Sequence, residues 1–172
     1  MSTLPDFPPV GRWAIGADAK DYGEQLLGAA QAQGLRTAWL GPEAAFLSNL
    51  SVLENLRLMH DWHETRVQSF ESDFLQALEV MQLEAPEWLL MRPAQLQDSQ
   101  LYCARLLRVL LLRPEVLVLS PVTLALAGEA MAERLLAQFD GVRIFLLDQP
   151  RGNWPAWPAH DILAPLPGET FP

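Results

Sequence analysis

Three polar residues in the second half of the sequence have the types that a nucleophilic enzyme needs. Ser120 follows a hydrophobic run, and Asp148 and His160 lie on either side of a loop rich in Trp and Pro. A serine–histidine–aspartate triad is therefore conceivable. Ser120 lacks the Gly-x-Ser-x-Gly turn that exposes a nucleophile, so an enzyme with a repurposed pocket is only an alternative. This enzyme alternative depends on whether the side chains of Ser120, Asp148 and His160 converge.

A second group, His60-Asp61-Trp62-His63, places two imidazoles at helical spacing. Such a pair suggests a metal site, but zinc requires at least three protein ligands and no convincing third ligand accompanies the histidines. We expect a solvated helix end here and no metal site. The single cysteine, Cys103, allows no internal disulfide, and its half-apolar helical position predicts a buried structural thiol.

Hydrophobic runs typical of buried strands alternate with segments of helical periodicity along the chain. This alternation predicts an α/β fold with a mainly parallel sheet and helices on both faces. The expected strands are 12–16, 35–40, 115–119, 142–147 and 161–166, and the expected helices are 22–33, 52–59, 64–82, a short one from 86, 98–112 and 128–139.

Several residues are expected to cap these helices. Asp21 with Glu24, and Ser51 with Glu54, have the spacing of capping boxes. Gly34 is expected just past the end of the first helix, where a left-handed backbone is common. Asp98 or Ser99 is expected to cap the helix that runs to Leu112.

The composition favours one packed domain covering residues 1–172. Half of the residues are hydrophobic and 19% are charged, which excludes a disordered chain. The formal net charge of −9 argues against a nucleic-acid partner, which would need a stripe of Lys and Arg. The longest apolar runs are too short to span a bilayer and the first residues lack a signal-peptide layout, so we expect a soluble, non-exported protein.

Three blocks, in the same order and spacing, resemble the ATP-binding subunit of ABC transporters. The first is FLSNLSVLENL (46–56), and the last is AHDILAPLPGE (159–169). Between them, LQDSQ (96–100) and RPEVLVLSPVTLALA (113–127) resemble the family's LSGGQ signature and the strand that follows it. The resemblance implies a P-loop NTPase fold of the ABC ATPase type, with a helical subdomain over about 50–112 and a reduced antiparallel subdomain.

The same resemblance implies that the phosphate-binding loop is degenerate. Only the first glycine, Gly16, is kept; Asp21 replaces the second glycine, Tyr22 replaces the lysine, and Gly23 replaces the hydroxyl that binds Mg²⁺. Lys20 lies two positions early, and we expect it to be a solvated turn residue. An Asp21 carboxylate at the helix start would repel phosphate.

The other nucleotide-contacting positions implied by the family differ as well. Pro42 stands where the family has a glutamine that coordinates Mg²⁺ and orients water. Ser120-Pro121 stands where the family has the metal-binding aspartate and the general-base glutamate. The switch histidine aligns with Leu147 or Asp148. Asp98 and Ser99 replace the two signature glycines.

One region retained in the resemblance is a candidate for docking a partner. In the family, the segment 46–59 and the helices that follow it form the groove for the transporter's permease. Core packing alone would also explain the apolar residues of this segment. Trp154 and Trp157 form either an exposed aromatic anchor or a cover for a sheet edge or a core gap. The candidate docking residues are Phe46, Leu47, Leu50, Trp62, Trp154 and Trp157.

These observations predict a non-catalytic relative of an ABC ATPase subunit that requires no cofactor. We expect a cytoplasmic, bacterial accessory or regulatory protein that docks on a membrane permease or pairs with an active ATPase subunit. Any association with a membrane would occur only through that partner. The alternatives are a divergent subunit that binds ATP and Mg²⁺, and the enzyme with a repurposed pocket.

Overall fold

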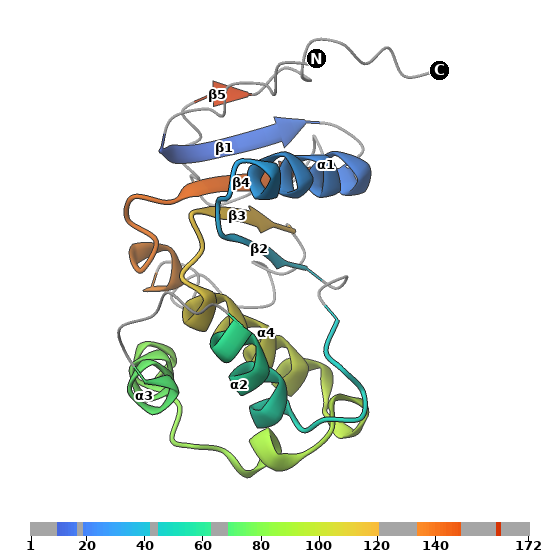
Figure 1. The fold of residues 1–172 in the computed structure, drawn as a ribbon, viewed down its shortest axis with the longest axis vertical. Helices are drawn as coiled ribbons and strands as arrows, with labels where there is room; N and C mark the ends of the chain where they lie inside the picture. Colours follow the sequence, from blue (N-terminus) through green and yellow to red (C-terminus); the bar gives the residue numbers. More distant parts are fainter. Residues whose placement is uncertain are drawn as a thin grey trace.

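The computed structural model describes residues 10–16, 19–41, 45–62, 69–120, 134–148 and 161–162. Five strands form one parallel sheet in the order β2-β3-β4-β1-β5. The sheet occupies the upper half of the molecule in Figure 1 and most helices lie below it. The strands are β1 (Gly11–Gly16), β2 (Thr37–Leu40), β3 (Val116–Leu119), β4 (Arg143–Asp148) and β5 (Asp161–Ile162).

The predicted fold class, a mainly parallel sheet with helices on both faces, is confirmed. All four residues of β3 are buried, because this strand lies between two others and is covered on both faces. Every strand pair in the described part of the chain is parallel. The expected strand 161–166 is described only for its first two residues.

One helix, α1 (Ala19–Ala32), covers the first face of the sheet. Its buried residues Gly23, Leu26 and Ala30 follow helical spacing and face the strands. The core beneath it is made by side chains of β3 and β4 together with Leu26 and Ala30; the strand residues are Val116, Val118, Phe145 and Leu147.

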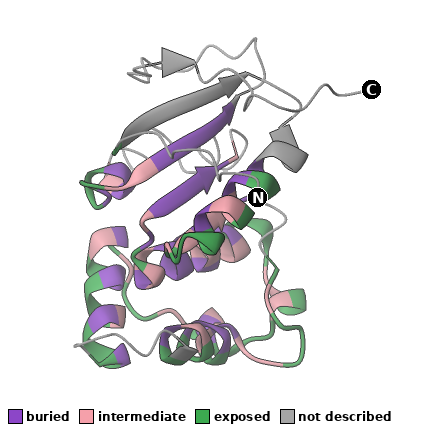
Figure 2. Ribbon diagram, turned by 45° about the horizontal axis from the view of Figure 1, so that its top comes forward, coloured by how far each residue is buried: buried purple, intermediate pink, exposed green. Residues whose placement is uncertain are grey.

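The second face of the sheet shares a larger core with the remaining helices. These are α2 (Val52–Trp62), α3 (Phe70–Met81), the 3-10 turns η1 (Glu87–Leu90) and η2 (Pro93–Gln95), and α4 (Asp98–Leu112). Buried residues line the inner faces of these helices and the strands β3 and β4 in Figure 2. Helix α4 is buried on most sides because it contacts β2, α2 and α3.

Two predicted helix starts are wrong. Helix α1 begins at Ala19, so Asp21 and Glu24 lie inside it and do not form the expected capping box. Helix α4 is preceded by Gln97 as its N-cap, and the Gln100 side chain accepts a hydrogen bond from the Gln97 N–H at 2.9 Å. Asp98 and Ser99 are therefore the first helical residues and not caps.

The end of α1 is predicted correctly. Gly34 has φ +76°, the Gly34 N–H donates to Gln31 O, and the Leu35 N–H donates to Ala30 O. These two bonds are a Schellman motif, which needs a left-handed residue that glycine adopts without strain. Helix α3 ends in the same way with Gln82 at φ 55°.

The predicted helix 64–82 is described only from Phe70, with Ser69 as its N-cap. The predicted helix 128–139 is described only over 134–137. The short helix expected from Pro86 is the 3-10 turn η1.

Candidate functional site

The carboxyl ends of the strands are where open parallel sheets bind their ligands. The backbones of Gly16 and Asp148 are paired across β1 and β4 at this edge. Ser120 follows β3 at the same edge, and its N–H donates to Leu40 O at 2.9 Å. Three predicted site positions thus share one edge, which places their backbones near one another.

The connection between β1 and α1 is short. Strand β1 ends at Gly16 and α1 begins at Ala19, which leaves residues 17 and 18 as the whole connection. A phosphate-binding loop needs several consecutive non-helical residues, because its backbone N–H groups must surround the phosphates. Lys20, Asp21 and Tyr22, expected in or beside such a loop, lie in the first turn of α1, and their side chains lie outside the described part of the structure.

Gly23 occupies the position that the resemblance assigns to the Mg²⁺-binding hydroxyl, and it is tightly enclosed. A Cβ atom at this position would lie 2.8 Å from Cη2 of Trp39 and 3.0 Å from Cδ1 of Leu147. The Trp39 Nε1 atom is buried without a hydrogen-bond partner in the part of the chain described. A hydroxyl-bearing side chain at Gly23 would therefore overlap Trp39 and requires this indole or the backbone to shift.

The remaining predicted positions at this edge are described in part. Ser120 is half-buried, whereas Pro42 and Pro121 lie outside the described residues. The side chains of Asp148 and His160 are likewise outside the description, so the convergence of the possible triad stays a prediction.

The loop before α2 is held by one buried amide. Asn55, 5% exposed, donates from Nδ2 to Leu47 O at 3.1 Å and to Ser51 O at 2.8 Å. Its Oδ1 accepts from the Leu47 N–H at 2.7 Å. Because all these partners are loop backbone groups, Asn55 fixes the path of residues 47–51.

Arg108 fixes the same loop from α4. Its guanidinium is buried, donates to Ala45 O at 2.7 Å and lies 4.7 Å from the ring centre of Phe46. Burial lowers the pKa of Arg108 to about 10, with a smaller contribution from Arg105, so it stays protonated at neutral pH. The roles of Asn55 and Arg108 were not predicted from the sequence, where a polar residue within an apolar helical pattern was the available signal.

The capping box at the start of α2 is confirmed. The Glu54 N–H donates to Ser51 Oγ at 3.2 Å, and Glu54 Oε2 accepts from the Ser51 N–H at 2.7 Å. These bonds, first the one from the Ser51 backbone, lower the pKa of Glu54. The box and the amide of Asn55 together give α2 a well-defined start.

The candidate docking residues differ in exposure. Phe46 is half-buried against the core, Leu47 is 52% exposed and Leu50 is half-buried. Trp62 ends α2, and its side chain lies outside the description, as do Trp154 and Trp157. Leu90 and Met91, 73% and 36% exposed, lie next to this loop because the Val52 N–H donates to Met91 O.

The expectation of a solvated helix end at His60 is wrong. His60 is 6% exposed, and its Nε2 lies 3.0 Å from Oδ2 of the buried Asp73. His63 lies outside the description. No group of three metal-ligand residues occurs in the part of the chain that is described. His60 is therefore a buried link between α2 and α3. The local sequence pattern did not predict that α3 packs against His60.

Cys103 is half-buried, and this burial raises the pKa of its thiol, consistent with a structural side chain. Among the described helices, none has both the length and the apolar character needed to cross a membrane.

Comparison with known proteins identifies the fold. No protein-family profile and no curated protein matches the sequence. Solved structures do match: the dimer of MJ0796, a bacterial ABC transporter cassette, has 12% identity and a TM-score of 0.56, covering 79% of this chain and 73% of that chain. A post-hydrolysis state of MJ0796 bound to ADP and Pi has 15% identity and a TM-score of 0.57, with the same coverage.

An ATP-binding protein assigned to an ABC transporter from Pyrococcus furiosus has 15% identity and a TM-score of 0.53, covering 83% of this chain and 80% of that chain. At such identities the likeness shows the fold alone. The chain has the α/β fold of ABC transporter ATP-binding cassettes.

Proposed function

We propose that this protein is a non-catalytic, cassette-like subunit that docks on a membrane transporter or pairs with an active ATPase subunit. The observation that carries the proposal is the fixed loop before α2. Two buried side chains, Asn55 and Arg108, hold its backbone while Leu47 faces solvent. A fixed loop with exposed apolar side chains is what a preorganised binding surface requires.

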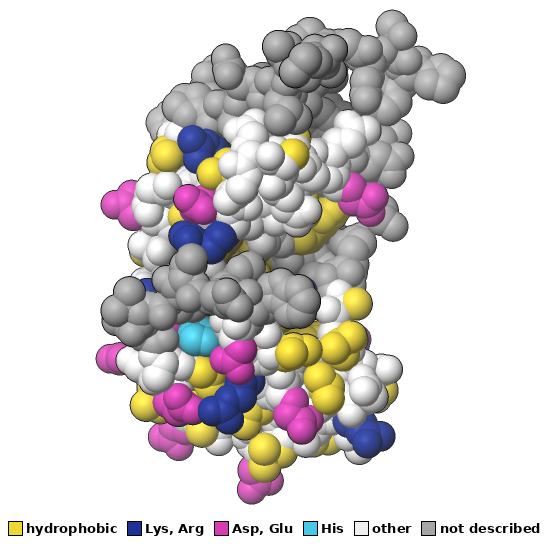
Figure 3. Space-filling model, viewed as in Figure 1, with side chains coloured by type: hydrophobic (Ala, Val, Ile, Leu, Met, Phe, Trp, Pro, Cys, Tyr) yellow, Lys and Arg dark blue, Asp and Glu magenta, His cyan; other side chains and the backbone are white. Residues whose placement is uncertain are grey.

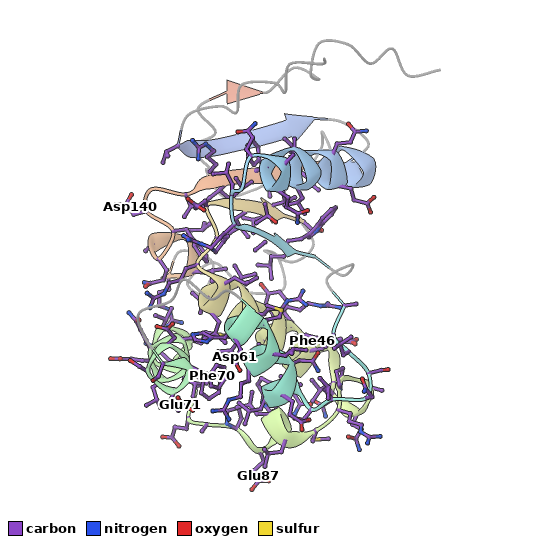
Figure 4. The ribbon with its side chains drawn as sticks, in the orientation of Figure 1. Phe46, Asp61, Phe70, Glu71, Glu87 and Asp140 are labelled. Atoms are coloured by element: carbon purple, nitrogen blue, oxygen red, sulfur yellow. The ribbon has the colours of Figure 1, made fainter. Side chains whose placement is uncertain are left out.

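We call this region the docking surface and define it by its apolar residues. In the orientation of Figure 4, where Phe46 is labelled, hydrophobic side chains gather at the same place in Figure 3. The docking surface consists of Phe46, Leu47, Leu50, Leu90 and Met91.

The non-catalytic half of the proposal is supported at the carboxyl edge of the sheet. The two-residue connection after β1 is too short for a phosphate-binding loop, and Trp39 fills the space beside Gly23. Ser120 also replaces the carboxylate that would hold Mg²⁺ at the end of β3. On this basis we expect neither ATP nor Mg²⁺ to be a cofactor.

Nucleotide binding is tested directly by calorimetry with Mg-ATP and Mg-ADP at millimolar concentrations. We expect no binding heat and no shift in melting temperature. Since a ligand that binds only the folded state raises its stability, a clear upward shift would instead favour a divergent nucleotide-binding cassette. The neighbouring structure bound to ADP and Pi makes this the main competing outcome.

Docking is tested by photo-crosslinking in the native host. A photoreactive side chain at Leu47 should capture a transporter permease or an ATPase subunit. The matched control is Leu75, which is 65% exposed on α3, outside the docking surface. Asn55→Ala should weaken the crosslink from position 47 because it releases the loop backbone. Equal capture of transporter subunits from both positions, or none from either, would contradict the proposal.

A further inference from the structure

A row of hydrogen bonds and ion pairs links the helices to the amino ends of the strands. We call it the polar seam. It lies at the opposite edge of the sheet from the positions that resemble a nucleotide site. Its side chains come from α2, α3, the end of α4 and the residues just before β2 and β3; they are His60, Asp73, Gln76, Arg113, Arg36 and Glu115.

Asp73 is the centre of the helical part of the polar seam. It is 4% exposed, and its two carboxylate oxygens have different partners. Oδ2 lies 3.0 Å from His60 Nε2 on α2, and Oδ1 accepts from Arg113 Nη2 at 2.8 Å. The same Arg113 nitrogen donates to Gln76 Oε1 at 2.8 Å. One buried carboxylate therefore ties α2 and α3 to the end of α4.

The sheet part of the polar seam continues from Arg113. Its carbonyl accepts from Arg36 Nε at 3.2 Å, and the Arg36 N–H donates to Glu115 Oε2 at 3.0 Å. The Glu115 N–H donates back to Arg36 O, and its carbonyl accepts from the Arg143 N–H at the start of β4. Consecutive hydrogen bonds thus connect Arg113 to the amino ends of β2, β3 and β4.

Packing along the polar seam is incomplete. A cavity of about 530 Å³ lies between α3 and the turn before β4, and it is lined by Asp73, Gln76, Arg113, Arg36 and Glu115, among others. Figure 4 labels Asp140, which lines the same cavity from that turn. Although α3 contributes Ala77, Leu78 and Met81 to the larger core, its connection beside this cavity is made by the polar bonds of Asp73 and Gln76 to Arg113.

The backbone at Arg113 is also unusual. Arg113 adopts a left-handed conformation with φ 45°, which a residue with a side chain rarely adopts. Such a conformation persists where surrounding contacts determine it. The paired guanidinium and the accepting carbonyl of Arg113 are these contacts.

We propose that the polar seam holds α2 and α3 in one fixed orientation on the sheet. The docking surface lies beside the first turn of α2, where the Val52 N–H donates to Met91 O, and His60 lies in the last turn of α2. Holding the last turn of this helix therefore also holds the end that borders the docking surface. The docking surface would then present one conformation to a partner, and no nucleotide at the carboxyl edge of the sheet would be needed to set it. The partner's role rests on the proposed function; the fixed orientation itself does not.

Hydrogen exchange on the isolated protein tests the polar seam. Arg113→Met removes the guanidinium at its centre. Arg57→Met is the matched control, because the Arg57–Glu71 pair also joins α2 to α3, at 2.6 Å. Both arginines are about half exposed, but Glu71 is exposed whereas Asp73, the partner of Arg113, is buried. We expect amides of α3 and the second half of α2 to exchange about tenfold faster in the Arg113 variant, with β3 and β4 unchanged. The control should leave all four elements within about twofold of the unmodified protein.

Equal acceleration in β3 and β4 would mean that Arg113 stabilises the whole fold, and unchanged α3 would mean that the polar seam holds nothing; either result overturns the inference. If Arg113→Met does not fold, Asp73→Asn replaces it, since the amide keeps the shape and weakens the two ionic partners. No partner is present in this measurement. A failed docking experiment would therefore leave the exchange result standing, and the reverse also holds.

Discussion

Among the described residues, the two edges of the parallel sheet differ in the side-chain contacts that they make. At the amino edge, Asp73, Arg113, Arg36 and Glu115 pair with one another and with backbone groups. At the carboxyl edge, the described side chains of Trp39 and Leu147 pack against Gly23, while the side chains of Lys20, Asp21 and Asp148 lie outside the described part of the chain. Sheets of this type usually hold functional polar groups at the carboxyl edge.

This difference indicates which part of the fold is held by polar contacts. Buried charges are costly unless they are paired, so a paired network persists where it has a structural role. The amino edge and the loop before α2 both contain buried polar side chains whose partners are backbone or charged groups. Within the described part of the chain, buried polar contacts therefore hold the helical part, which is what the proposed docking role requires.

The largest effect is expected from Asp73→Ala at the amino edge. The substitution leaves buried His60 and the Arg113 guanidinium without their shared carboxylate, and unfolding in urea should show a loss of about 3 kcal/mol. Glu71→Ala on the same helix removes a carboxylate from an exposed pair and should cost at most about 0.5 kcal/mol. Similar losses for both variants would show that the amino edge is not specially paired.

A smaller effect is expected from Gly23→Ala at the carboxyl edge. The added methyl group would meet the rigid Trp39 ring at 2.8 Å, and such overpacking should cost about 2 kcal/mol. Gly28→Ala on the same helix meets nothing within 4 Å and should stabilise the protein by up to about 1 kcal/mol. Thermal unfolding of the two variants in opposite directions supports a closed carboxyl edge; if both stabilise, the space beside Gly23 is open.

The sequence predicted the parts of the fold that depend on local patterns. The all-apolar run at 116–119 predicted a central strand, and Gly34 and the Ser51–Glu54 pair predicted helix ends, because each signal lies within a few residues. The start of α1 was predicted incorrectly, since Asp21 resembles a cap only when the residues before it are not helical.

Contacts between distant segments were not predictable in this way. His60 and Asp73 are thirteen residues apart, and Arg113 is forty residues beyond Asp73. These side-chain contacts depend on how α2, α3 and α4 pack together, and the periodicity of hydrophobic residues within one helix does not predict that packing. Likewise, Phe46, Leu47 and Leu50 were predicted as candidate docking residues, but the neighbouring Leu90 and Met91 were not. The buried Asn55 and Arg108 that hold the loop were not predicted either.

The smallest effect concerns the first turn of α2, and its pH dependence separates a charged cap from a neutral one. Ser51→Ala should cost about 1 kcal/mol at neutral pH. Glu54 has a pKa below its ordinary 4.5 in the folded protein, so its contribution is present above the unfolded value and is lost as the pH falls through the folded value. The stability difference between Ser51→Ala and the unmodified protein should therefore shrink in that acidic range.

Ser69→Ala is the control, because Ser69 caps α3 by accepting from the Ser72 N–H at 3.3 Å and Ser72 carries no carboxylate. The loss of stability caused by Ser69→Ala should persist at the pH where Glu54 is protonated. Parallel pH profiles for the two variants would show that the Glu54 carboxylate does not stabilise the start of α2.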